Sequence, residues 1–108
     1  MMNGQELSTA VREGVPVKVV LCDNEVHGSI LKGQLDRYGA ENGFATRMGS
    51  PDFALVAQGY GAAAWTVRRT AEFAPAFAAA LAHEGPALVR VMFDARDIAP
   101  YGNEKDAV

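Results

Sequence analysis

The chain has 108 residues, of which 49% are hydrophobic and 21% charged, and its formal net charge is −3. This size allows at most one globular domain, and the sequence lacks the basic stretches that nucleic-acid-binding proteins carry. A single cysteine, Cys22, excludes an internal disulfide, and no apolar run is long enough to cross a bilayer. We therefore expect a cytoplasmic protein that binds neither nucleic acid nor membranes.

Helix and strand signals alternate along the chain. Asn3 to Glu6 has the form of a capping box, and the nearly continuous apolar run from Val15 to Cys22 is typical of a central strand covered on both faces. Ser50 and Thr70 are the expected N-caps of two later helices. In chain order we expect a helix over residues 3–13, a strand over 15–22, a helix over 29–38, a helix from Ser50–Pro51 to about residue 59, a strand over 62–67, a helix over 71–83 with Phe73, Phe77, Ala80 and Leu81 facing inward, a strand over 87–93 and a loosely ordered tail over 95–108.

Strands separated by helices predict an α/β fold, with three α/β/α layers around a mainly parallel sheet. In such sheets, ligands bind beyond the carboxyl ends of the strands. Residues 23–28, Asp-Asn-Glu-Val-His-Gly, follow the first strand and precede a helix. They are the expected binding loop, because their oxygen donors and the helix amides suit a phosphate-bearing ligand with a divalent cation.

Other chemistry at this loop stays open from the residues alone. Cys22 could be a nucleophile activated by His27, although no third group orients the pair. Cys22, Asp23 and His27 could bind a transition metal, but they have no clear fourth ligand because His83 lies at a distant helix end. The stretch "GYGAAA" at residues 59–64 matches a dinucleotide-binding pattern, yet it follows a helix and precedes a strand, the reverse of the required context.

Stretches in three parts of the chain resemble one enzyme superfamily. "MNGQELSTAVREGVPVKVVLCDNEVHGSI", residues 2–30, is similar to the second half of the thiamine-diphosphate motif of the acetolactate synthase, benzoylformate decarboxylase and pyruvate decarboxylase superfamily. "SPDFALVAQGYGA", residues 50–62, is similar to the family's "NPDFxxLAxAYGA", and "FAPAFAAALAHEGPALVRVMFD", residues 73–94, extends the resemblance. The chain thus resembles the C-terminal, diphosphate-binding domain of these lyases and transferases, which act on 2-oxo acids.

The resemblance implies a cofactor and its ligands. In the family, a divalent cation, usually magnesium, joins the diphosphate of thiamine diphosphate to the Asp of a Gly-Asp-Gly segment, the second Asn of Asn-Asn and a backbone carbonyl two residues later. The matching positions here are Asn24 and Val26, and His27 and Gly28 would lie beside the diphosphate. Asp23 replaces the first Asn of the pair and adds a negative charge.

The resemblance also implies missing parts. No Gly-Asp-Gly segment occurs among the 108 residues, and Glu6, Glu13 and Glu25 match no catalytic position of the family, whose activating glutamate lies on a separate domain. We expect residues 1–108 to be a single partial domain, a C-terminal fragment that carries half of the magnesium-diphosphate site, is inactive alone and self-associates through its unpaired strand edge. The alternative is a non-catalytic α/β interaction or scaffold module that kept the fold and lost cofactor binding.

Overall fold

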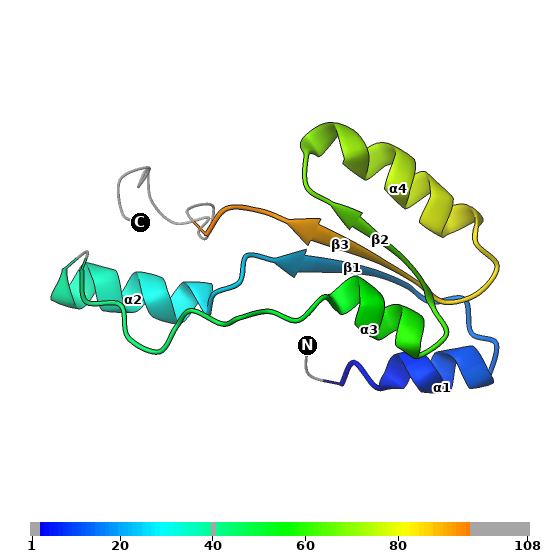
Figure 1. Cartoon of the computed structure of the whole chain (residues 1–108), viewed down its shortest axis with the longest axis horizontal. Coiled ribbons are helices and arrows are strands. Elements are labelled where there is room, and N and C mark those ends of the chain that lie inside the picture. Colours follow the sequence, from blue (N-terminus) through cyan, green and yellow to red (C-terminus); the bar gives the residue numbers. More distant parts are fainter. Residues whose placement is uncertain (1–2, 40, 96–108) are drawn as a thin grey trace. The chain divides into compact units, whose positions relative to one another are not determined.

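The computed structural model describes residues 3–39 and 41–95 (Figure 1). Its elements are α1 (Glu6–Arg12), β1 (Lys18–Asp23), α2 (Gly28–Tyr38), α3 (Phe53–Gly59), β2 (Ala63–Val67), α4 (Thr70–Ala82) and β3 (Ala87–Met92). The predicted order of helices and strands is confirmed. All but the first residue of the predicted tail over 95–108 lies outside the described residues.

The chain divides into two compact units. Unit 1 comprises Met1–Cys22 and Pro51–Met92, and unit 2 comprises Asp23–Ser50 and Phe93–Val108. Among the described residues of both units, no helix is long and apolar enough to cross a membrane.

Unit 1 is built on a three-stranded parallel sheet in the order β1-β3-β2, which confirms the α/β fold class. β2 and β3 run parallel, with Ala63 beside Ala87 and Val67 beside Val91. Successive residues of a strand point to opposite faces, so β3 supplies both sides of the sheet with core residues. Leu7, Ala57, Ala62 and Leu88 form one apolar cluster with α1 and α3, and Val67, Ala80, Ala87 and Val89 form another with α4. Figure 1 shows α4 on one side of the sheet and α1 and α3 on the other.

The prediction that the first strand is central and covered on both faces is wrong. β3 lies in the middle of the three strands, and its residues Ala87 to Arg90 are all buried. β1 lies at an end of the sheet, where Val20 is 43% exposed. The helix α4 packs on β2 and β3, and none of the described residues of β1 belongs to the apolar cluster that forms around α4.

Lys18 breaks the apolar run of β1 for a structural reason. Its ammonium group donates hydrogen bonds to the carbonyl oxygens of His83, at 2.5 Å, and Gly85, at 2.6 Å. These carbonyls lie at and just beyond the C-terminal end of α4, where backbone acceptors have no partner within the helix. The lysine therefore links β1 to the end of α4.

Two predicted N-caps are wrong: Asn3 is not the N-cap of α1, and Ser50 is not the N-cap of α3. The N-cap of α1 is Gln5, and the helix begins at Glu6. Asn3 has a φ of 61°, and its backbone carbonyl, rather than its side chain, accepts the Glu6 N–H. The N-cap of α3 is Asp52, whose carboxylate accepts hydrogen bonds from the next turn. A carboxylate in this position is also favoured by the helix dipole.

The start of α4 also differs from the prediction, because Arg69 and not Thr70 is its N-cap. The Glu72 carboxylate reaches back and accepts the backbone N–H groups of Arg68 and Arg69 at 2.9 and 3.2 Å. On the inward face of this helix Phe73 and Phe77 stack, with ring centroids 5.5 Å apart. Leu81, expected to face inward, is 57% exposed.

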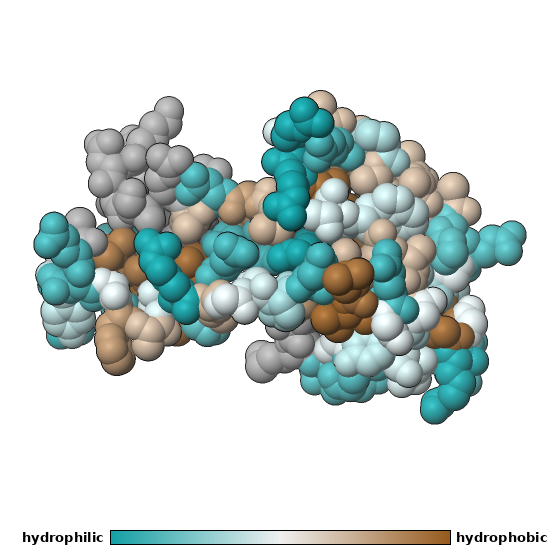
Figure 2. Space-filling model, viewed as in Figure 1, coloured by the Kyte–Doolittle hydropathy of each residue, from teal (hydrophilic) through white to brown (hydrophobic). Residues whose placement is uncertain are grey.

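Exposed apolar side chains also occur on α3 of unit 1. Leu55 is 64% exposed, and Figure 2 shows a brown, apolar patch over this helix. The buried face of α3 is formed by Ala54 and Ala57, which are 8% and 0% exposed.

Candidate functional site

The loop over residues 23–28 lies where the sequence predicted a binding loop. β1 ends at Asp23 and α2 begins at Gly28, so the loop joins the carboxyl end of a strand to the N-terminus of a helix. Two side chains shape it. Asp23 Oδ1 accepts the backbone N–H of Glu25 at 3.1 Å, and Asn24 Oδ1 accepts that of Val26 at 3.3 Å. These are two successive turns in which an acid or amide side chain bonds the backbone two residues on, and Glu25 between them has a φ of 60°.

A second segment of unit 2 runs antiparallel to this loop. The N–H of His27 donates to the carbonyl of Thr46, and that of Met48 to the carbonyl of Glu25, each at 2.8 Å. Val26 and Arg47 lie opposite each other between these two hydrogen bonds. In such a pair the backbone groups of the central residues point away from the partner segment, so the Val26 carbonyl is directed to the other side of the loop.

Asn24 and Val26 provide oxygen atoms suited to a hard cation. Asn24 is half-buried, and its Oδ1 has a second lone pair beyond the one used for the Val26 N–H. Within the described residues, no donor reaches the Val26 carbonyl. Amide and carbonyl oxygens are ligands that Mg²⁺ accepts, so the residues present fit one side of a magnesium site.

The N-terminus of α2 completes the loop with free donors. His27 is the N-cap, and its carbonyl accepts the N–H groups of Ile30 at 3.1 Å and Leu31 at 2.9 Å. The N–H groups of Gly28 and Ser29 have no acceptor among residues 3–39 and 41–95, and no side chain caps the helix. Such free amides, together with the helix dipole, favour a bound anion. The His27 side chain is exposed beside them.

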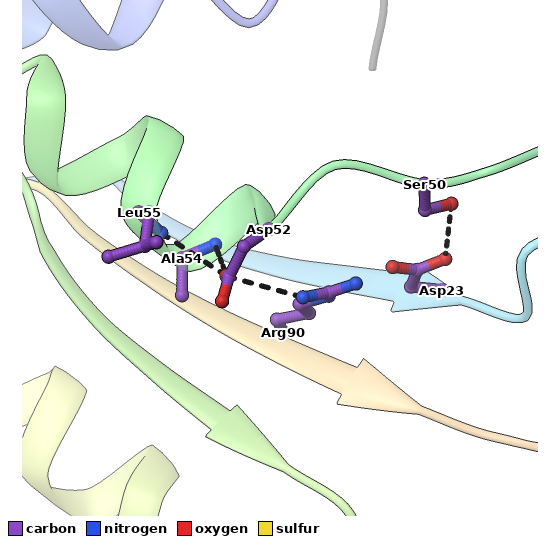
Figure 3. Close-up of polar contacts among 6 residues, drawn as sticks. All are labelled: Asp23, Ser50, Asp52, Ala54, Leu55 and Arg90. Atoms are coloured by element: carbon purple, nitrogen blue, oxygen red, sulfur yellow. Dashed lines mark hydrogen bonds and ion pairs between the residues drawn. The ribbon is translucent and has the colours of Figure 1, made fainter.

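Ser50 is a site residue that sequence reasoning missed. Its hydroxyl donates to Asp23 Oδ1 at 3.1 Å, and the Asp23 side chain is buried (Figure 3). The sequence placed Ser50 at a helix start, and nothing in the local pattern linked two residues 27 positions apart. Thr46 and Arg47, which face the loop, were missed for the same reason.

Another polar contact lies within unit 1. Arg90 on β3 is 4% exposed, and its Nη1 lies 3.2 Å from Oδ1 of Asp52, the N-cap of α3 (Figure 3). The guanidinium group also lies over the ring of Phe53, 5.7 Å from its centroid. Asp52 additionally accepts the N–H groups of Ala54 and Leu55 at 3.0 and 3.3 Å. This cluster fixes the start of α3 against the central strand.

The alternative chemistry gains no support from the structure. Among the described residues, no three His, Cys, Asp or Glu side chains are grouped so that they could hold a metal ion, which contradicts the transition-metal interpretation of Cys22, Asp23 and His27. The "GYGAAA" stretch runs from the end of α3 into β2, the context that argued against a dinucleotide site.

The fold and the loop together define an α/β domain in which a loop joins the carboxyl end of a parallel strand to the N-terminus of a helix. Residues 1–91 match the family described as thiamine pyrophosphate enzyme, C-terminal TPP binding domain. The chain belongs to this family, as the resemblance indicated.

Several acetolactate synthases are similar to the chain. The acetolactate synthase of Arthrospira platensis is 36% identical over 94 residues, which is 83% of this chain and 16% of that protein. The large subunit of acetolactate synthase isozyme 2 of Escherichia coli strain K12 is 32% identical over 94 residues, 87% of this chain and 17% of that protein. The acetolactate synthase large subunit of Pyropia yezoensis is 33% identical over 90 residues, 82% of this chain and 15% of that protein. The chain thus spans less than a fifth of the length of these relatives.

Proposed function

We propose that this chain forms the diphosphate-binding part of a thiamine-diphosphate-dependent enzyme of the acetolactate synthase type, a transferase or lyase acting on 2-oxo acids. Family membership and the acetolactate synthases among the relatives support the cofactor and the reaction class. The observation that carries the proposal is the loop over residues 23–28, which offers oxygen atoms that can bind a cation and, at the start of α2, free backbone N–H groups that can bind an anion.

Each loop residue has a distinct part in this proposal. Asn24 Oδ1 and the Val26 carbonyl bind Mg²⁺, and the Gly28 N–H and the His27 side chain contact the diphosphate. A bound thiamine diphosphate would supply the carbanion chemistry that reactions of 2-oxo acids need. The residues of this chain bind and orient its diphosphate end.

The 108 residues hold only one side of this site, because they contain no Gly-Asp-Gly segment. We expect weak cofactor binding and no turnover of a 2-oxo acid by these residues alone. The remaining ligands and the group that activates the cofactor must come from other protein segments, whether in the same polypeptide or in a partner chain.

NMR of the ¹⁵N-labelled chain can detect such weak binding. Addition of Mg²⁺ with thiamine diphosphate at millimolar concentration is expected to shift the amide signals of residues 24–29, whereas thiamine without the diphosphate is not. Asn24→Ala should remove the magnesium-dependent shifts. Asn42→Ala is a matched control, because Asn42 also lies in unit 2 but its side chain donates to the Tyr38 carbonyl at the end of α2.

The proposal fails if the wild-type chain shows no shifts in this loop, or if Asn24→Ala leaves them unchanged. Either result would favour the non-catalytic interaction module instead.

We also propose that the chain self-associates through unit 1. Val15, Val17 and Val20 are 50%, 39% and 43% exposed, and β1, which carries Val20, lies at an end of the sheet. An exposed strand edge with apolar side chains pairs readily with another chain. A monomeric mass by light scattering at micromolar concentration would contradict this.

A further inference from the structure

We propose that Asp23 and Ser50 form a clasp that holds the cofactor loop in its binding shape. In this role Asp23 positions the ligands Asn24 and Val26 and does not itself bind the cation. The inference rests on the proposed function for its consequence in cofactor binding, but the clasp can be tested in the free chain.

The contacts of Asp23 are those of a structural residue. Asp23 is only 5% exposed, and its Oδ1 accepts hydrogen bonds from both the Ser50 hydroxyl and the Glu25 N–H, each at 3.1 Å. Its backbone carbonyl accepts the Phe93 N–H at 3.2 Å. Asp23 is thus held by donors from three segments of unit 2.

The clasp continues the antiparallel pairing that carries the loop. His27 is bonded to Thr46, Val26 lies opposite Arg47, and Glu25 is bonded to Met48. Each step back along the first segment corresponds to one step forward along the second, and two further steps reach Asp23 and Ser50. Their side-chain hydrogen bond therefore falls in the same register and joins the two segments at the end of the pairing that lies beyond Glu25 and Met48.

The pairing between the two segments includes a residue with a strained backbone, Glu25. Glu25 has a φ of 60°, a left-handed conformation that a residue with a Cβ adopts at an energetic cost. Its N–H is fixed by Asp23 and its carbonyl by Met48. Loss of the clasp should let this residue relax, which would turn the neighbouring Val26 carbonyl away from the position in which it can bind a cation.

The clasp also accounts for a carboxylate beside a diphosphate site. A negative charge there would repel the ligand, but a carboxylate oxygen that accepts two hydrogen bonds has part of its charge compensated. Ser50 and the Glu25 amide supply those hydrogen bonds on Oδ1.

Hydrogen exchange in the cofactor-free chain tests the clasp directly. Ser50→Ala and Asp23→Ala should each speed exchange of the His27 and Met48 amides several-fold, since these amides bond across the pairing. Ser50→Thr and Asp23→Asn, which keep a hydroxyl donor and an oxygen acceptor, should largely preserve protection. Ser8→Ala, an exposed serine of α1 in unit 1, should change neither amide.

Magnesium-dependent binding of thiamine diphosphate then separates positioning from coordination. As a positioning pair, Ser50→Ala and Asp23→Ala should weaken binding by a similar factor, about two- to tenfold for one hydrogen bond, and the double variant should be no weaker than Asp23→Ala alone. Ser50→Thr should restore binding.

Unchanged exchange in Ser50→Ala would overturn the clasp. Strongly reduced Mg²⁺-dependent binding in Asp23→Asn with unchanged exchange would show that Asp23 is a cation ligand and would overturn the positioning role. If the wild-type chain shows no cofactor binding, the proposed function fails, while the exchange experiment still decides whether the clasp exists.

Discussion

Replacement of Asp52 by asparagine should destabilise the chain more than its partly exposed position suggests. Asparagine is as good an N-cap as aspartate, so Asp52→Asn keeps the oxygen that accepts the Ala54 N–H. It removes only the negative charge that faces Arg90 at 3.2 Å. The guanidinium is buried on the central strand, with its side chain 5% exposed, and cannot turn to solvent.

The magnitude follows from the two environments. A hydrogen bond to a charged group contributes about 1.5–3 kcal/mol. The Asp52 side chain is 48% exposed and partly screened, so the lower end, about 1.5 kcal/mol, is expected for Asp52→Asn. Asp52→Ala also loses the cap, which adds about 1 kcal/mol and gives about 2.5 kcal/mol in total.

Asp36→Asn provides a matched control. Asp36 is also 48% exposed, and it pairs with Lys32 one turn away on α2 at 2.7 Å, but the Lys32 side chain is 23% exposed. A pair of this kind contributes about 0.3–0.5 kcal/mol. The two substitutions differ chiefly in how deeply the cation is buried.

Urea unfolding followed by the fluorescence of Trp65 on β2, the chain's single tryptophan, measures the difference. The expected order of stability loss is Asp52→Ala, then Asp52→Asn, then Asp36→Asn. Equal losses for the two asparagine variants would refute the reasoning that burial of Arg90 makes its ion pair important.

Two further predictions concern backbone conformation and pH. Gly33→Ala, within α2 and with nothing within 4 Å of the new Cβ, should stabilise the chain by about 0.5–1 kcal/mol. Gly61→Ala should destabilise it, because Gly61 has a φ of 90°. Thermal unfolding of both variants checks these opposite signs. The N–H of Arg68, and then the side chain of Arg69, lower the pKa of Glu72 below its ordinary value. Because the folded state then binds fewer protons, this contribution to stability is complete above the ordinary glutamate pKa of about 4.3 and is lost as the pH falls through the lowered pKa. Glu72→Gln should flatten that part of the stability profile in acid, and an unchanged slope would show that Glu72 does not contribute.

The order of elements could be predicted because each signal is local. The apolar runs before Asp23 and before Phe93, and the glycine after Tyr38, each specify their own segment. The same locality explains why the position of the loop over residues 23–28 was predicted, since its place between a strand and a helix needs no knowledge of distant contacts.

The helix starts and the strand order could not be predicted from local signals. Ser50 and Asp52 both offer an oxygen to the same helix, and distant residues decide between them: Ser50 is bonded to Asp23, and Asp52 is paired with Arg90. The runs that became β1 and β3 are similarly apolar, so only the pairing of strands far apart in the sequence places β3 in the middle.

The site was predicted in part. The location of the loop follows from the sequence, and the roles of Asn24, Val26, His27 and Gly28 remain predictions. The antiparallel segment over Thr46 to Met48 and the contact of Ser50 could not be foreseen, because irregular chain over residues 41–50 carries no periodic signal.

The amine of Lys18 gives strand β1 a fixed position along its own length. A parallel strand could shift by two residues and still present the same side chains to the same face. Such a shift would move the ammonium group by about 6.6 Å and separate it from the carbonyls of His83 and Gly85 together. The residue that interrupts the apolar pattern therefore favours one register of β1. Because β1 leads into the loop over residues 23–28, contacts at the start of the strand help to fix where that loop begins.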